Sequence, residues 1–268
     1  MSDIASSDNY IGSAAYIAQQ KILHEQSAMY LAHAQSRKTI NIMGIACSSV
    51  NHDDEDPRVP SSTKILMDTL AYAQTMTSRY PIETRQYVLD DMDFTHCEAN
   101  YSMKGHYCTR PCWISQRMAK KGLADPLTSL YYDLVDRCDI ILIATPIRWG
   151  SPSSLYFKLV ERLNCIENQK EVYGVDLIHD QLCGGIIIGA QDGAQHVMGT
   201  IMSVWSELWF AFAKNPFIAY TAWWLRNQRT DIIPDQLQTE QKLIQSMQHD
   251  MLSAQIRTIE QRRAYNAS

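Results

Sequence analysis

The chain has 268 residues, of which 46% are hydrophobic and 20% charged, the balance of an ordinary globular protein. Its length fits one domain of about 150 to 200 residues with extensions. A net charge of −5 argues against a nucleic-acid-binding surface. No basic segment followed by an apolar one opens the chain, so we expect no signal peptide. Seven cysteines without a secretion signal favour reduced thiols in a cytoplasmic protein.

Three regions are expected along the chain. Residues 1–38 are rich in Ala, Gln, Ser and Tyr, and apolar residues recur there at helical spacing, which predicts a helical N-terminal extension. Residues 39–225 are expected to form the main domain. Residues 226–268 carry widely spaced apolar residues among glutamines, which predicts an amphipathic C-terminal helix that packs on the domain or on a partner subunit.

Within the main domain, β-type runs alternate with helical runs. We expect strands at 40–46, 83–91, 140–145 and 183–190, and helices at 61–76, 127–139, 153–166 and 193–212. Residues 91–125 are expected to be irregular. The apolar segment 204–225 is interrupted by Glu207, Lys214 and Asn215-Pro216, which favours a buried or interface segment over a membrane span. The alternation predicts an α/β fold with a doubly wound parallel sheet, covered by helices on both faces.

Three predicted strands are followed by unusually polar loops, which would meet at the carboxyl edge of a parallel sheet, where ligands bind. The first loop leads to Ser61-Ser62-Thr63 at a helix start, whose N–H groups and hydroxyls suit a phosphate monoester. The alternative is a simple N-cap. The sequence contains neither GxxxxGK[ST] nor GxGxxG, so neither an ATP phosphate loop nor a Rossmann dinucleotide site is supported.

The second loop, "TPIRWGSPSS" (145–154), is equipped for a flat, partly polar ligand. Backbone N–H groups from Ile147 to Gly150 would contact a ring edge, Trp149 offers a stacking face, and Arg148 would favour an anionic ring. The alternatives are a packing aromatic and a surface salt bridge. In the third loop, "GAQDGAQH" (189–196), glycine allows close backbone approach. His196 is either a proton donor or an ordinary helix-cap residue.

These segments resemble the flavodoxin-like NADPH-dependent FMN reductase family. The stretch "IILIATPIRWGSPSSLYFKLVERL" resembles its flavin-loop signature, "IMGIACSSV…SSTKILMDTL" its phosphate loop and "GGIIIGAQDGAQHVMGTI" its third flavin loop. The resemblance implies a flavodoxin-like three-layer fold with FMN bound non-covalently. The cofactor-binding residues that it implies are Ser48, Ser49, Ser61, Ser62, Thr63, Pro146, Ile147, Arg148, Trp149, Gly150, Ser151, Gln191, Asp192 and Gly193.

The first loop departs from the family pattern. Cys47 stands where the family has glycine, Ser49-Val50 replace Pro-Arg, and an acidic run, His52–Asp56, separates the two halves of the phosphate loop. The implied activity is hydride transfer from NAD(P)H to the flavin and onward to a quinone, a flavin or another small acceptor. No catalytic acid or base is expected, since the flavin carries the redox chemistry. A homodimer or homotetramer is expected through the terminal extensions.

The stretch "CEANYSMKGHYCTRPC" is a second candidate site. Cys97, Cys108 and Cys112 lack the CxxC spacing of cluster and zinc sites. Three interpretations stay open: packing thiols, a redox-active pair such as Cys108 with Cys112, and a metal site with His96 or His106 as a further ligand. We predict no metal. The alternatives to an FMN reductase are accordingly an iron–sulfur flavoprotein and a flavodoxin-fold binding protein that no longer holds FMN.

Overall fold

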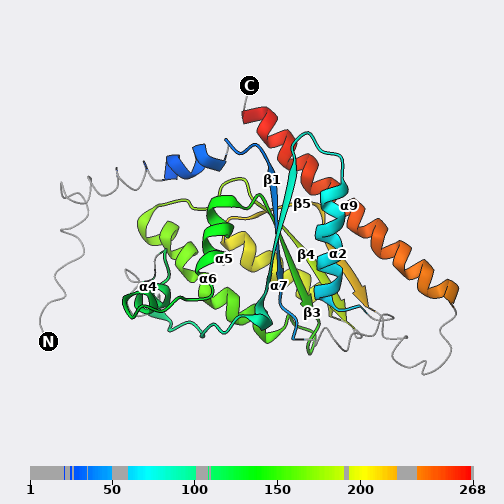
Figure 1. Cartoon of the computed structure of the whole chain (residues 1–268), viewed down its shortest axis with the longest axis horizontal. Helices are drawn as coiled ribbons and strands as arrows, with labels where there is room; N and C mark the ends of the chain where they lie inside the picture. The colour runs from blue at the N-terminus through cyan, green and yellow to red at the C-terminus, as the bar shows by residue number, and fades with distance from the viewer. Residues whose placement is uncertain are drawn as a thin grey trace, which may run out of the picture.

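The computed structural model describes residues 21, 25, 27–34, 36–49, 60–100, 108, 110–189, 193–221 and 234–266. At its centre, five parallel strands form one sheet in the order β2-β1-β3-β4-β5 (Figure 1). The strands are β1 (Ile40–Ala46), β2 (Ile82–Val88), β3 (Ile140–Pro146), β4 (Leu182–Gly189) and β5 (Ala211–Thr221). This is the strand order of flavodoxin-like doubly wound sheets, so the predicted fold class is confirmed.

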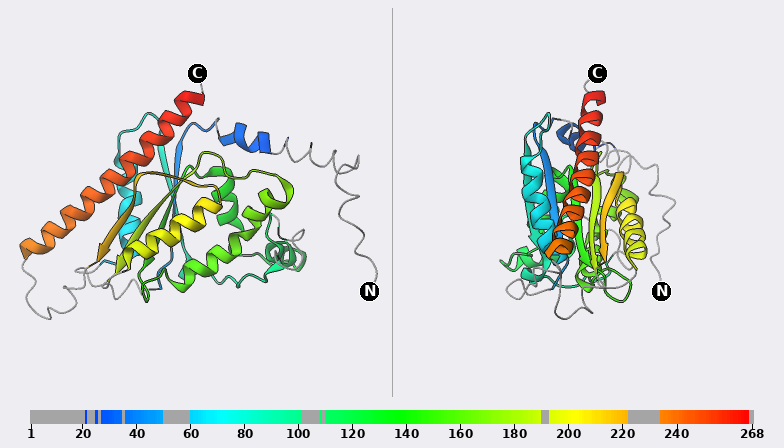
Figure 2. Two further views of the ribbon diagram at one scale, coloured as in Figure 1. Left: turned by 180° about the vertical axis from the view of Figure 1, so that it is seen from behind. Right: turned by 90° about the vertical axis from the view of Figure 1, so that its right-hand side faces the viewer.

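Helices cover both faces of the sheet (Figure 2). On one face, α2 (Ser62–Thr75) and α9 (Pro234–Asn266) bury apolar side chains against the strands. The other face is covered by α4 (Trp113–Lys120), α5 (Thr128–Tyr132), α6 (Ser154–Tyr173) and α7 (Ala194–Glu207). Two short turns lie between these elements, a 3-10 turn η3 (Leu89–Asp91) and a π-helical turn η5 (Asp133–Arg137). The result is the expected three-layer arrangement.

The two-sided cover explains why the central strands are apolar throughout. Successive strand residues point to opposite faces. In β3, Ile140 and Leu142 pack toward α2 and α9, while Ile141 and Ile143 pack toward α5, α6 and α7. A strand buried on both faces has no position at which a polar side chain meets water.

The structure corrects the sequence prediction in four places. The strand expected at 83–91 ends at Val88, and the 3-10 turn η3 follows it. Residues 91–125 are not wholly irregular, because they contain α4. Helix α6 continues past residue 166 to Tyr173 and ends at Gly174, whose φ of 67° allows the left-handed cap. The helix expected to reach residue 212 ends at Glu207, and an unpredicted fifth strand follows.

The fifth strand escaped prediction because Lys214-Asn215-Pro216 interrupts its apolar pattern. In the structure these residues form a bulge: Phe212 pairs with Cys183 and Phe217 with Gly185, so the intervening residues have only Gly184 opposite them. Asn215 has a φ of 54° in this bulge. Proline is tolerated there because β5 is an edge strand and the bulge needs no ladder hydrogen bond from it.

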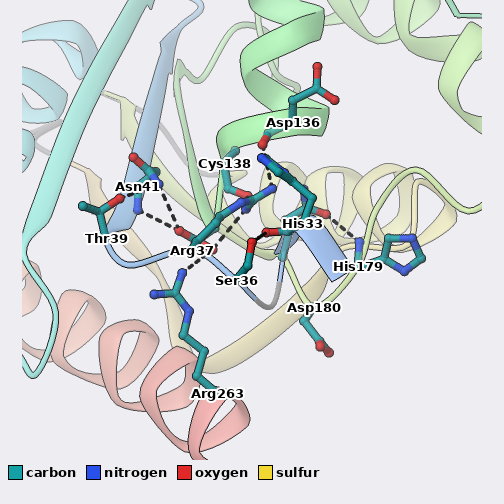
Figure 3. A network of polar contacts seen from close by, with 12 residues as sticks. His33, Ser36, Arg37, Thr39, Asn41, Asp136, Cys138, His179, Asp180 and Arg263 are labelled. Atoms are coloured by element: carbon teal, nitrogen blue, oxygen red, sulfur yellow. Dashed lines mark hydrogen bonds and ion pairs between the residues drawn. The ribbon is translucent and has the colours of Figure 1, made fainter. Parts of the chain in front are cut away.

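Figure 3 shows that three residues from distant parts of the chain lie close together at the amino edge of the sheet: Arg37, Asn41 and Arg263. Asp139, just before β3, accepts hydrogen bonds from Arg37 (3.1 Å), from Arg263 of α9 (2.8 Å) and from the Asn41 N–H of β1 (2.8 Å). All three charged side chains are more than nine-tenths buried. This network fastens the segment before β1 and the end of α9 to the sheet.

The terminal segments are described only in part. Residues 27–34 are helical, whereas the other apolar positions that predicted an N-terminal helix lie outside the described residues. The predicted C-terminal helix is confirmed as α9. The domain limits at residues 38 and 225 stay a prediction. No helix in the described part of the chain is both long and apolar enough to cross a membrane.

Candidate functional site

The loops that follow β1, β3 and β4 begin at the same edge of the sheet. These strands are adjacent and parallel; Ala46 is in register with Ala144, and Pro146 with Ile188. The strand order reverses between β1 and β3, and ligands of open α/β sheets bind beside such a reversal. This edge lies opposite the Asp139 network, so one end of the sheet anchors the chain and the other presents the loops.

The start of α2 carries two buried hydroxyl groups without a partner. Ser61 is the N-cap, and its Oγ accepts a 3.0 Å hydrogen bond from the Lys64 N–H. The next two hydroxyls, Ser62 Oγ and Thr63 Oγ1, are buried and make no hydrogen bond within the described residues. An unpaired buried hydroxyl costs about 1–3 kcal/mol. A ligand with strong hydrogen-bond acceptors would remove that cost.

The electrostatics of this helix start suit an anion. The first N–H groups of a helix carry partial positive charge, and the first turn of α2 holds no acidic residue. At the end of β1, Ser48 is fully buried and Ser49 is exposed. The acidic run His52–Asp56 lies outside the described residues. The donor set that is described therefore fits a phosphate monoester.

A tight turn follows β3. Arg148 and Ser151 exchange two backbone hydrogen bonds of 2.8 and 2.9 Å. Between them, Trp149 and Gly150 have φ angles of 52° and 75°. Positive φ at both central positions is the geometry of a type I′ turn, which explains the glycine. The turn's own bonds do not use the N–H groups of Trp149 and Gly150.

The two conspicuous side chains of this turn point away from the core. The Trp149 side chain is 100% exposed, which rules out its alternative role as a packing aromatic within the described structure. Arg148 is also exposed and forms no ion pair with any described residue, so its alternative role in a surface salt bridge is likewise unsupported. Both side chains are available to a ligand or a partner.

The second and third loops touch through two glycines. Gly193 has a φ of 118°, and a Cβ built on it would lie 2.8 Å from Gly150 Cα and 3.2 Å from Gly150 O. No side chain fits between the two turns. At the base of the loops, the Ile147 N–H donates to Ile188 O at 2.8 Å. Gln191 and Asp192, the other predicted residues of the third loop, lie outside the described residues.

A hydroxyl pair that the sequence did not single out joins the first loop to the second. Ser153, the N-cap of α6, donates to Cys47 O at 2.5 Å and accepts from the Tyr156 N–H at 3.3 Å. Its own N–H donates to Thr145 Oγ1 at 3.1 Å. The available signal was a serine directly before a helical run, which is typical of an N-cap. All four residues are buried, so these bonds fix the spacing of the loops.

Cys47 and His196 are the other candidate groups at this edge. Complete burial raises the pKa of the Cys47 thiol far above its ordinary value, so it stays protonated. His196 is exposed on the first turn of α7, where its carbonyl accepts a bond from Thr200.

The structure places the three cysteines of the second candidate site at different depths. Cys97 is half-buried, Cys108 and Cys112 are buried, and His106 lies outside the described residues. Among the described residues, no group of three or more His, Cys, Asp or Glu side chains is placed to hold a metal ion. The Cys165 thiol of α6, which donates to Arg162 O at 3.6 Å, is the main group that lowers the pKa of Cys112. The sequence could not indicate this pair, because its members lie far apart in the chain.

No family model matches the chain. A curated relative, 8-demethyl-8-aminoriboflavin-5′-phosphate synthase from Streptomyces davaonensis, is 28% identical over 91 residues, which are 34% of each chain. The match thus spans about a third of that relative's length. The solved structure of RosB with bound 8-demethyl-8-formylriboflavin-5′-phosphate is similar with a TM-score of 0.59 and 14% identity, over 83% of this chain and 80% of RosB. The azoreductase AzrA is similar with a TM-score of 0.50 and 10% identity, over 81% of this chain and 99% of AzrA.

These likenesses agree with the strand order and with the helix cover on both faces. At this level of identity they establish architecture. The resemblance noted in the sequence holds for the fold, and the donors at the start of α2 fit a phosphate monoester. The chain is a flavodoxin-like α/β protein.

Proposed function

We propose that the chain binds FMN at the carboxyl edge of the sheet and works as an oxidoreductase, which passes reducing equivalents from NAD(P)H to a quinone, a flavin or another small acceptor. The observation that carries the proposal is the pair of buried, unpartnered hydroxyls of Ser62 and Thr63. These hydroxyls belong to α2, the helix that follows β1. Strand β1 lies beside β3, the strand that leads into the turn at Gly150. The likeness to RosB and AzrA supports the proposal.

The residues divide between the two ends of the flavin. Hydroxyls of Ser48, Ser49, Ser61, Ser62 and Thr63, with the first N–H groups of α2, would hold the phosphate. The second and third loops would border the isoalloxazine through Pro146, Ile147, Arg148, Trp149, Gly150, Ser151, Gln191, Asp192 and Gly193. When bound, FMN supplies the hydride and electron transfer, while the protein provides binding and orientation.

A spectrum of the purified protein tests the cofactor. Bound oxidised FMN gives bands near about 370 and 450 nm, which anaerobic NADH or NADPH should bleach if the reductant is as proposed. A colourless protein that takes up no added FMN would overturn the proposal and leave a flavodoxin-fold binding protein. A yellow protein that neither nucleotide bleaches would overturn only the NAD(P)H dependence.

The phosphate site is tested by removing its unpartnered hydroxyls. Ser62→Ala combined with Thr63→Val should raise the Kd for FMN at least tenfold, which corresponds to about 1.4 kcal/mol. The stability of the FMN-free protein should stay the same or rise, because the removed hydroxyls have no partner to lose. Thr200→Val is the matched control, since the Thr200 hydroxyl is bonded within α7. Equal FMN affinity in both variants would contradict this placement of the phosphate.

A second candidate function is conversion of a flavin 5′-phosphate as a substrate. The observation in its favour is that the curated relative and the RosB structure both concern riboflavin-5′-phosphate derivatives. Mass spectrometry of FMN recovered after incubation in air separates the two roles. A cofactor is recovered unchanged, whereas a substrate acquires an altered 8-position.

Three further expectations belong to the proposal. We propose a homodimer or homotetramer, built through the terminal extensions, which light scattering on a sizing column would test. The extensions themselves are proposed as residues 1–38 and 226–268 around a domain of residues 39–225. A cytoplasmic location stays a prediction that imaging of the tagged protein would test.

A further inference from the structure

A cavity of about 600 Å³ lies at the amino edge of the sheet, away from the three loops. Helical residues 27–34 form one wall, and the turn η5, the last part of α6 and the segment before β4 form the others. Because the chain enters β3 and β4 here, the cavity and the proposed flavin site lie at opposite ends of the strands. Its volume is within the range of about 300–1,000 Å³ that is typical of small-molecule sites.

One side of this cavity is apolar. Val175 and Leu177, in the segment between α6 and β4, are buried and line the cavity together with Met29 and Tyr30 of the helical residues. The Met29 side chain is 71% exposed. Methionine is flexible and adapts its shape to a neighbouring apolar group. The apolar body of a ligand would therefore be taken out of water on this side.

The polar side is organised around Arg110, whose side chain is 9% exposed. Its guanidinium forms a 2.5 Å ion pair with Asp136 and donates to the Tyr30 hydroxyl oxygen at 2.9 Å. The rings of Tyr30 and Tyr132 also lie against it, with centroids 5.6 and 4.9 Å from Arg110 Cζ. These contacts hold the guanidinium in place before a ligand arrives, which lowers the entropy cost of binding.

The neighbouring polar groups are placed to donate hydrogen bonds. The Tyr30 oxygen accepts from Arg110, so its own O–H hydrogen is left for a ligand. Gln169 Oε1 accepts a 3.0 Å hydrogen bond from the Arg110 backbone N–H, which leaves the Gln169 amide N–H groups for a ligand as well. The Asp136 carboxylate is already engaged by Arg110. A ligand that fits this side must therefore bring hydrogen-bond acceptors.

The surrounding charges favour an anion. Arg37 donates to the backbone oxygen of Asp136 at 3.0 Å, and its other bonds join it to Asp139 (Figure 3). Asp139 also pairs with Arg263. This connected network, Arg110 included, contains three arginines and two carboxylates, so it carries one net positive charge. A ligand with a single negative charge would balance it.

We propose that this cavity binds a compact apolar monocarboxylate, whose carboxylate is held by Arg110, Tyr30 and Gln169. Hydrogen bonds from a guanidinium to a carboxylate are about twice as strong as neutral ones. The occupant would join helical residues 27–34 to the domain, close to the 2.9 Å hydrogen bond from the Asp176 N–H to Ser27 Oγ. The site uses none of the flavin-loop residues, so it stands independently of the proposed function.

Calorimetric titration of the full chain with 2-naphthoate tests the site, and 2-naphthamide is an uncharged probe of the same shape. We expect a Kd of about 0.1 mM or lower for naphthoate and binding at least about tenfold weaker for naphthamide. A naphthoate Kd above about 1 mM, or equal Kd values for the two probes, would overturn the proposal. The titration is then repeated at saturating FMN. The Kd should not change, whereas displacement of naphthoate by FMN would place it at the loops and overturn the assignment.

A tyrosine variant tests how the carboxylate is held. Tyr30→Phe keeps the ring against Arg110 but removes the O–H donor, so it should weaken naphthoate binding about tenfold. Tyr72→Phe is the matched control, because the Tyr72 hydroxyl bonds His249 between α2 and α9, on the other face of the sheet. It should leave the Kd unchanged. Wild-type affinity in Tyr30→Phe would overturn the placement of the carboxylate.

A charge variant at the exposed rim gives a second readout that does not disturb the core. Met29→Glu should weaken naphthoate binding about threefold to tenfold relative to Met29→Gln, because it adds a like charge beside the carboxylate. The binding of naphthamide should be the same in both variants. If naphthoate also binds both variants equally, it does not lie in this cavity and the proposal is wrong.

Discussion

The contact between Gly193 and Gly150 predicts a strong effect of adding one methyl group. Gly193→Ala would place a Cβ 2.8 Å from Gly150 Cα, closer than packed atoms allow, at a φ of 118° that alanine rarely adopts. The backbone strain alone costs about 1–3 kcal/mol, and relief of the clash requires the two turns to separate. We expect the free energy of unfolding to fall by about 3 kcal/mol. If the ring lies between these turns, the Kd for FMN should rise at least tenfold.

The matched control lies on the same helix. Gly199 is in the interior of α7, and a Cβ built on it meets no atom within 4 Å. Gly199→Ala should therefore stabilise the protein by up to about 1 kcal/mol through helix propensity. Urea denaturation, with the m-value checked for constancy, measures both variants. If Gly193→Ala proves as stable as Gly199→Ala, the two turns do not touch as described.

Three further variants test other parts of the structure. Ser153→Ala should lower the free energy of unfolding, measured by urea denaturation, by about 1–3 kcal/mol, because it removes a helix cap and leaves the buried Cys47 carbonyl unpaired. Ser154→Ala, at the exposed neighbouring position, should change it by less than about 0.5 kcal/mol. Similar losses in both variants would refute the hydrogen-bonded link between the two loops. Asp139→Asn should lower the free energy of unfolding by about 3–5 kcal/mol, since Arg37 and Arg263 would lose a buried counter-charge. The FMN affinity of the folded fraction should not change. A free energy of unfolding within about 1 kcal/mol of wild type would contradict a structural role for Asp139. Trp149→Ala should leave the melting temperature unchanged, because the ring is exposed. An altered FMN affinity or a raised KM for the acceptor would confirm that Trp149 has a binding role. If both values are unchanged, Trp149 has no binding role.

The sequence was sufficient to predict the layers of the fold. Strand β1 was predicted with the bounds that the structure shows, and β3, β4, α2 and α9 lie where the apolar patterns place them. These patterns are informative because burial on one or two faces dictates which positions must be apolar. Strand β5 was missed for the same reason: its bulge interrupts the pattern that burial would otherwise produce.

For the candidate site, the sequence proposed residues but could not give the contacts between them. A glycine after a strand indicates a turn, yet only the folded chain shows that Gly193 rests on Gly150 and that Ser153 joins Cys47 to α6. Equally, the spacing of the cysteines suggested Cys108 and Cys112, whereas in the folded chain Cys165 is the main group that lowers the pKa of Cys112.

The sequence by itself determined which segments are buried and where helices begin, since these follow from hydrophobic period and local capping. The tertiary structure alone decided which loops touch and which hydroxyls are left without partners. These properties depend on groups that are remote in the chain and close in space, and no local pattern encodes them.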